Sequence, residues 1–136
     1  MALIVPNSAE GFILGYIVGT ETPEALTIRL FDNDYTPTET DTVAAYTEVT
    51  GSNYAGISLG TPGNWTITDG EPSLAEHTQV SWTFDANANQ VGNVYGYYVT
   101  RDTSNDLVWA ERFTNGPYNI QTENDQIRIT PRLTAN

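Results

Sequence analysis

The sequence predicts an all-β protein: a single-domain antiparallel β-sandwich of about eight strands, with the jelly roll as one form of it. Runs in which apolar and polar residues alternate recur along the 136 residues, and turn residues bound each run. Val, Ile, Thr, Tyr, Phe and Trp, which favour a pleated, half-buried surface, account for 53 residues, and no window sustains a helical period. The expected strands are residues 12–18, 26–30, 56–59, 65–68, 78–84, 94–100, 107–113 and 127–133.

The expected elements differ in the kind of evidence behind them. Residues 12–18 form the longest apolar stretch, whereas residues 26–30, 78–84 and 127–133 alternate apolar and polar side chains. Residues 43–49 favour one short helical turn. Segments 94–100 and 107–113 flank a polar link whose length and composition are typical of a hairpin connection. Two sets of alternate residues should each share a face of this hairpin: Tyr95 with Tyr97 and Val99, and Leu107 with Trp109 and Phe113.

Two segments differ from the rest in composition and suggest contact surfaces. Residues 1–11 are expected to form an N-terminal arm or first strand, and residues 12–136 the sandwich domain. The apolar tip before Pro6 is expected to pack on a neighbouring subunit. Residues 32–42, the longest polar stretch, are expected to be an exposed loop that reaches a partner or solvent. The candidate subunit or capsid contacts are Leu3, Ile4, Val5, Asp32, Asn33, Asp34 and Tyr35.

The charge balance is strongly acidic and excludes two classes of partner. Seventeen Asp and Glu face five arginines and no lysine, which gives a net charge of −12. Nucleic-acid binding needs a basic patch that displaces counterions, and an anionic membrane surface repels such a chain. The lack of cysteine excludes disulfides and cysteine metal sites. We expect neither a secretion signal nor a membrane span, because Arg29 is the first basic residue and the apolar runs are short.

One sequence pattern is also found in hydrolases. Residues 56–60 read Gly-Ile-Ser-Leu-Gly, which fits the G-x-S-x-G pattern around a nucleophilic serine, and Asp69 and His77 follow in the order those enzymes use. That motif needs a helix directly after it, whereas residues 61–63, Thr-Pro-Gly, cannot begin a long one. We interpret residues 56–60 as a strand that ends in a turn, and we expect the protein not to be an enzyme.

Metal and cofactor sites are weakly indicated. His77 is the single histidine, and one imidazole with carboxylates is a poor zinc site, so we expect a solvated loop side chain. Residues 32–34 with Glu39 and Asp41 are the densest acidic cluster, and calcium takes such oxygen ligands. Residues 36–37, Thr-Pro, break the spacing of an EF-hand. We interpret the cluster as an acidic loop, leave calcium open, and predict no cofactor.

Two features keep carbohydrate chemistry open. Alternation points Glu111 toward an apolar face, where it is either an acid for glycoside hydrolysis or a structural residue that pairs with Arg101 or Arg112 or lies at the rim of the sheet. We take the structural role for Glu111. A group of aromatic residues forms either a sugar-stacking platform or part of the core, and we take the core. These are Trp65, Trp82, Trp109, Tyr95, Tyr97 and Tyr98.

Two stretches of the chain resemble small structural proteins of tailed double-stranded DNA phages, especially those that infect cyanobacteria and other aquatic bacteria. Residues 25–59 read ALTIRLFDNDYTPTETDTVAAYTEVTGSNYAGISL, and residues 94–134 contain VYGYYVT, LVWAERFTNGPYNI and IRITPRLT. Together they cover 76 of the 136 residues. These motifs are moderately specific marks of the family and are not catalytic signatures.

The resemblance implies a capsid cement or decoration protein. Such a protein binds the major capsid protein on the outer surface of the head shell, stabilises the shell, and acts as a homotrimer. It would be made in the host cytoplasm and end in the virion. Two other roles stay open: a tail, baseplate or fibre accessory protein, which copy number per particle separates, and a carbohydrate-binding module, which glycan binding through Trp65 or Trp109 would support.

Overall fold

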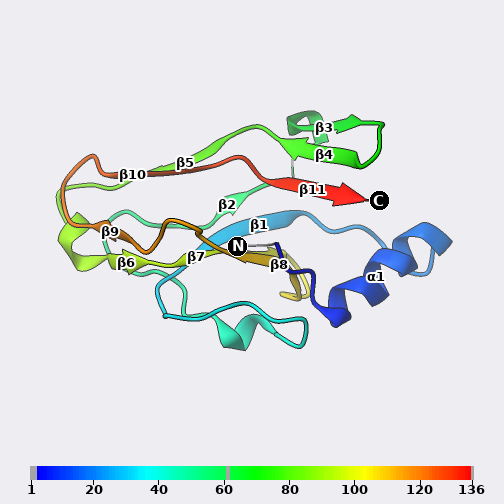
Figure 1. Cartoon of the computed structure of the whole chain (residues 1–136), viewed down its shortest axis with the longest axis horizontal. Helices are drawn as coiled ribbons and strands as arrows, with labels where there is room; N and C mark the ends of the chain where they lie inside the picture. The colour runs from blue at the N-terminus through cyan, green and yellow to red at the C-terminus, as the bar shows by residue number, and fades with distance from the viewer. Residues whose placement is uncertain (1–2, 61, 136) are drawn as a thin grey trace.

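The computed structural model describes residues 3–60 and 62–135, and these contain eleven strands and one α-helix (Figure 1). All seven strand pairings among them are antiparallel, which confirms the predicted all-β class. The helix is α1 (Asn7–Val18). The strands are β1 (Leu26–Phe31), β2 (Ile57–Ser58), β3 (Trp65–Thr68), β4 (Ser73–His77), β5 (Val80–Thr83), β6 (Gly92–Val94), β7 (Gly96–Arg101), β8 (Leu107–Arg112), β9 (Tyr118–Ile120), β10 (Gln126–Ile129) and β11 (Arg132–Ala135).

The strands form two layers (Figure 1). β4 runs on into β5, and β10 runs on into β11, so the sheets β11-β4-β3 and β10-β5 make one bent upper layer. The sheet β2-β1-β7-β8 lies beneath it. α1 contacts β8 at one end of the lower layer, and the pair β6-β9 lies at the other end. The main core between the layers includes Ile28, Leu30, Val80, Trp82, Val99, Trp109, Ile127 and Ile129.

The β7–β8 hairpin is present as predicted, but both of its predicted faces are corrected. Tyr95 packs against a cluster on the outer face of the lower sheet, whereas Tyr97 and Val99 lie in the main core. The pairing is regular up to Val99 opposite Trp109, after which Thr100 lies opposite Leu107 and Val108 is left over. This β-bulge turns Leu107 away from Trp109, because side chains alternate with a period of two. Trp109 lies in the main core. The outer face of the lower sheet carries a second cluster, here called the aromatic cluster, formed by Phe31, Tyr46, Tyr98, Leu107 and Ala110.

The prediction of a strand at residues 12–18 is wrong, because this segment belongs to α1. Pro6 precedes the helix with an extended backbone, and Gly19 ends it in the left-handed region at φ 77°, where its N–H binds the Gly15 carbonyl. A short apolar run fits a strand or a helix equally well, so the run alone did not decide between them. The helix also crosses the expected junction between residues 11 and 12, and residues 1–2 lie outside the described part.

The remaining predicted segments are found in the structure, and three further strands were not predicted. β3 has the predicted bounds, and the 3₁₀ turn Val43–Ala45 lies in the predicted helical turn. Segment 127–133 divides near Pro131, which has no N–H, into β10 paired with β5 and β11 paired with β4. The sequence does not predict β4, β6 or β9. β4 reads Ser-Leu-Ala-Glu-His, and the other two have only three residues each and contain asparagine.

Candidate binding surface

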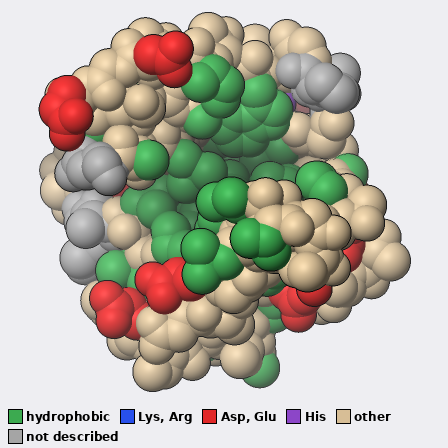
Figure 2. Space-filling view, turned by 90° about the vertical axis from the view of Figure 1, so that its right-hand side faces the viewer, with side chains coloured by type: hydrophobic (Ala, Val, Ile, Leu, Met, Phe, Trp, Pro, Cys, Tyr) green, Lys and Arg blue, Asp and Glu red, His purple; other side chains and the backbone are tan. Residues whose placement is uncertain are grey.

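The two layers diverge at the end of the molecule where α1 lies, and this leaves the inner face of the β11-β4-β3 sheet partly uncovered (Figures 1 and 2). Ile67 lies opposite Ala75, and Ala75 lies opposite Leu133, so these three side chains share one face of the sheet. Trp65 and Leu133 on that face pack against the main core. Ile67, further along β3, is 68% exposed. One sheet face thus passes from the core to the surface.

Two adjoining depressions hollow the molecule at this end (Figure 2). One, of about 520 Å³, lies between the N-terminal residues 3–5 and β11. The other, of about 220 Å³, lies between β3 and β11, and the two share Leu133 and Thr134. A further depression of about 320 Å³ borders Trp65 from the side of Leu26. We call the surface formed by Leu3, Val5, Ile67, Ala75, Leu133 and Ala135 the apolar hollow.

α1 adds a second apolar surface at the same end. Its inner side is buried through Ala9, Phe12 and Gly15. Its outer side carries four apolar side chains, between 38% and 76% exposed, which helical spacing places beside one another. An exposed apolar stripe of this kind contributes nothing to the core and is typical of an interaction surface. The four residues of this exposed helix face are Ile13, Leu14, Ile17 and Val18.

Arg101 holds α1 against the lower sheet. Its guanidinium lies 4.7 Å from the centre of the Phe12 ring. The same group pairs with Glu24 at 2.8 Å, and with Glu21 and Asp106 at 3.3 Å each. A side chain that is only 8% exposed therefore joins the helix, the segment after it and the β7–β8 turn. This arrangement fixes where the exposed helix face stands relative to the apolar hollow.

The surroundings of the apolar hollow are acidic. Figure 2 shows Asp and Glu side chains around it and no Lys or Arg side chain on this face. Glu39 borders the hollow. Arg132 also borders it, but its guanidinium pairs with Glu76, and both residues belong to the opposite face of the β11-β4-β3 sheet. Arg29, Arg101 and Arg112 form ion pairs within the chain as well.

Leu3, Ile4 and Val5, predicted to pack on a neighbouring subunit, pack on their own chain. Ile4 exchanges two backbone hydrogen bonds of 2.9 Å with Ala110, which forms a single β-bridge on the free edge of β8. Leu3 and Val5 contact the main core. All three stay half-buried and form one wall of the larger depression. Contact with a partner stays a prediction for these residues.

The remaining predicted contacts, Asp32, Asn33, Asp34 and Tyr35, begin a loop that covers the aromatic cluster. The Asn33 side chain donates to the Ala45 carbonyl at the end of the 3₁₀ turn and accepts from the Thr47 N–H just after it. Asp34 is exposed and pairs with Arg112 at 2.7 Å. Burial raises the pKa of Asp32. The loop, expected to be exposed, is therefore exposed only in part, because it also serves as the cover of an apolar sheet face.

Asp41 is the buried centre of this loop. Its carboxylate accepts hydrogen bonds of 2.7 Å from the hydroxyls of Tyr35 and Tyr46. It also accepts bonds from the N–H of Thr38 at 2.9 Å and from its hydroxyl at 2.6 Å. Burial on its own raises the pKa of Asp41, but these donors outweigh it and hold that pKa below its usual value.

In the described ranges, no three His, Asp or Glu side chains gather as metal ligands.

The residues of the hydrolase-like pattern are engaged separately. Ser58 lies exposed on β2, within the predicted strand, and its Oγ accepts a bond from the Gly60 N–H at 3.3 Å. The prediction that His77 is a solvated loop side chain is wrong, because it is buried at the end of β4. Its Nδ1 lies 2.7 Å from the Thr78 carbonyl oxygen, and its ring meets Trp65 edge-on. Neither side chain is set up as a nucleophile and base pair.

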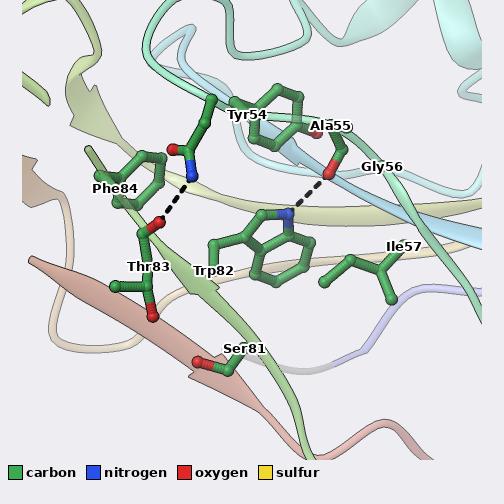
Figure 3. Close-up of a pocket in the computed structure, with 9 residues that line it drawn as sticks. Tyr54, Ala55, Gly56, Ile57, Ser81, Trp82, Thr83 and Phe84 are labelled. Atoms are coloured by element: carbon green, nitrogen blue, oxygen red, sulfur yellow. Dashed lines mark hydrogen bonds between the residues drawn. The ribbon is translucent and has the colours of Figure 1, made fainter. Parts of the chain in front are cut away.

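A pocket of about 220 Å³ lies where residues 53–57 cross β5 (Figure 3). Trp82, which is buried, forms part of it, and its Nε1–H donates to the Ala55 carbonyl at 2.8 Å. Tyr54 stacks on this indole, and the Asn53 amide donates to the Thr83 carbonyl at 3.0 Å. The indole and amide groups that Figure 3 shows are thus bound to the backbone. We assign this pocket a structural role.

The aromatic residues considered for sugar binding lie mostly inside the protein. Trp82, Trp109, Tyr97 and Tyr98 are buried, which confirms that they belong to the core. Glu111 accepts a hydrogen bond from the Tyr97 hydroxyl at 2.8 Å. Glu111 is thus engaged structurally, as expected, and the partner that the described residues show for it is Tyr97.

Sequence reasoning found only one wall of the apolar surface. It singled out residues 3–5 but missed Ile67 and the exposed helix face. Interpreting residues 12–18 as a strand concealed the helix face. A proline before this segment and Gly19 after it, at the spacing of a three-turn helix, were the available signals.

No helix in the described part of the chain is long and apolar enough to cross a membrane. Comparison of the chain with protein-family models, with curated proteins and with solved structures finds no match in any of the three.

Proposed function

We propose that the chain is a non-enzymatic structural protein of a virion, a cement or decoration protein that binds the outer surface of a phage head shell and stabilises it. The phage assignment comes from the resemblance of residues 25–59 and 94–134 to such proteins. The sandwich-like all-β fold is of the kind expected for that role. The homotrimer is likewise an implication of the resemblance.

The observation that carries the binding role is the uncovered apolar end of the sandwich. Folded domains bury large apolar side chains where they can, yet Ile17 and Ile67 are both more than two-thirds exposed at this end. Contiguous exposed apolar surface is typical of a site of protein contact. The side chains with catalytic potential, Ser58 and His77, are instead bound to backbone groups.

The proposed role has a simple physical basis. A shell filled with DNA is under outward pressure, and a protein that contacts several coat subunits adds buried area where those subunits would separate. An interface of ordinary size buries about 1,600 Å² in total. Three linked copies would bind with an avidity that no single contact provides. The net charge of −12 keeps such a protein from adhering to nucleic acid.

Copy number per particle tests this function. In purified particles of the virus that encodes the chain, quantitative mass spectrometry should find hundreds of copies, and antibody labelling should place them on the head. A handful to dozens of copies would indicate a tail, baseplate or fibre accessory protein instead. Absence from the particles would refute the virion role.

Binding to shells gives a second, direct test. Shells assembled from the major coat protein alone should bind the chain saturably and should break open at a higher temperature once it is bound. Shells mixed with the heat-unfolded chain serve as the control, because the unfolded chain has the same net charge but lacks the folded surface. Equal opening temperatures with and without the folded chain would contradict a cement role.

A further inference from the structure

We propose that the apolar hollow and the exposed helix face together bind an apolar segment of another protein, and that lysine or arginine residues flank this segment. The inference rests on the proposed function for the partner being a protein. It adds the surface that makes the contact and the chemistry that the partner must have.

The shape and the apolar lining of the surface are the reason to expect an apolar segment as its ligand. The depression of about 520 Å³ and the adjoining one of about 220 Å³ meet at Leu133, so one continuous stretch of a partner chain fits into both. Ile67 and Ala135 at the outer end are exposed, and each presents only hydrocarbon to a ligand. Burial of such groups is favourable by roughly 25 cal/mol for each Å² removed from water.

The negative charge around the surface is the reason to expect basic residues on both sides of the partner's apolar segment. Acidic side chains stand around the hollow, and no Lys or Arg side chain is visible on this face (Figure 2). Glu39 at the border forms no ion pair within the described residues. Charged groups at the rim of an interface steer the encounter and select the partner by sign. A segment with Lys or Arg beside its apolar residues would fill the hollow with its apolar side chains and place positive charge at the acidic border.

The same charge disfavours a second copy of the chain on this face. Two-fold pairing would bring two identical acidic borders together, and each copy has a net charge of −12. Four of the five arginines already form ion pairs, and Arg128 binds the Gln126 side chain. The chain thus has almost no free positive charge to offer another copy. A homotrimer would have to be built on a different face.

Two synthetic peptides test the partner's chemistry directly. Both contain the same five apolar residues, which are flanked by two pairs of lysines in one peptide and two pairs of glutamates in the other. Titration into ¹⁵N-labelled chain should shift amide signals of β3, β11 and α1 with the lysine-flanked peptide, and much less with the glutamate-flanked one. Added salt should weaken the first interaction, because salt screens exposed charges.

Substitutions on neighbouring residues of β3 test the surface. Ile67→Glu places a charge in the apolar hollow and should weaken binding of the lysine-flanked peptide about tenfold, because a carboxylate replaces an apolar contact with the peptide. Thr68→Glu is the matched control, because it adds the same charge one residue later on the opposite face of the strand. Both positions are exposed, so both variants should give the wild-type pattern of folded amide signals.

The outcomes separate this inference from the proposed function. Equal binding of both peptides, no binding, or shifts confined to other elements would overturn the inference, as would equal affinities of the Ile67→Glu and Thr68→Glu variants. Shifts at the same residues that grow with protein concentration alone would show that a second copy occupies the face. The copy-number measurement tests virion membership whatever the peptides show.

Discussion

Two apolar surfaces of the same molecule are treated in opposite ways. The aromatic cluster on the outer face of the lower sheet is covered by the chain's own loop, and Phe31 within it is fully buried. The apolar hollow at the divergent end has no such cover in the described residues, and Ile67 there is mostly exposed. Both surfaces lie on β-sheet faces, so the strands themselves do not create the difference in burial. The loop that covers the aromatic cluster creates it.

The covering loop is held by polar groups that are satisfied internally. Asp41 accepts four hydrogen bonds, from Tyr35, Tyr46 and Thr38, so the loop has one favoured position over the cluster. Hydrogen bonds to a charged group contribute about 1.5–3 kcal/mol each. At the divergent end, the polar contacts of Arg101 hold α1 beside the hollow and not over it. One apolar surface is thus core, and the other remains available for a partner.

The sharpest test of this comparison is truncation of one apolar residue on each surface. Phe31→Ala should lower the free energy of unfolding by about 3–5 kcal/mol, because it leaves a cavity beneath the loop. Ile67→Ala should change it by less than about 0.5 kcal/mol, because the side chain is already exposed. Urea unfolding followed by circular dichroism measures both. Similar losses for the two variants would show that the hollow is core in solution.

Removal of Arg101 should have the next largest effect, on the wall beside the hollow. Arg101→Ala eliminates three ion pairs and the contact with Phe12, and it should cost about 2–4 kcal/mol because the cation is nearly buried. Amide hydrogen exchange should speed up in α1 more than in β7. Arg128→Ala is the control, because that arginine is exposed and its side chain binds Gln126 on its own strand. Unchanged exchange in α1 would contradict the role of Arg101 as its anchor.

Asp41→Asn should have a smaller effect that depends on pH. The folded pKa of Asp41 is lowered, so its ionisation stabilises the fold above the unfolded value of about 3.9, and this contribution is lost as pH falls through the folded pKa. At neutral pH the variant should lose about 1–3 kcal/mol, because buried hydroxyls lose their charged acceptor. As pH falls through the folded pKa of Asp41, the stabilities of the two proteins should converge. A constant difference across that range would exclude ionisation of Asp41 as the cause.

The smallest expected effect is that of metal removal. Light scattering should give the same mass in calcium and in EDTA, about 45 kDa for the implied trimer of a 14.9 kDa chain, because the described carboxylates do not gather as ligands. Ile67→Glu should leave this mass unchanged if trimer contacts lie away from the hollow. A mass that falls in EDTA would point to the acidic loop as a metal site.

The sequence predicted the class of the fold because alternation records which side of a strand is buried. The polar link between its two segments located the hairpin, whereas alternation located β1, β5 and β10. It failed for residues 12–18, where both sides of a helix are apolar and no period stands out. It also failed at the hairpin end, where one extra residue, Val108, changed the face of Leu107.

The candidate surface was less predictable than the fold. Residues 3–5 stand out in the sequence because Pro6 separates them from the body of the chain. Ile67 does not stand out, since it belongs to an ordinary apolar and polar alternation. Whether such a residue is core or surface depends on how far the opposite layer reaches, and that is decided by residues distant in the sequence. Exposure of this kind is visible only once the layers are in place.

The bulge in the β7–β8 hairpin also has a consequence for how the chain tolerates insertion and deletion. Removing any one of the regularly paired residues of β8 would invert the side chains on one side of the gap, moving Trp109 or Ala110 to the wrong face. Val108 is different, because it has no opposite residue and the pairs on either side of it already face correctly. Its loss would cost its own burial and leave the neighbouring faces unchanged. Position 108 is therefore where this strand best accommodates a change in length between related chains.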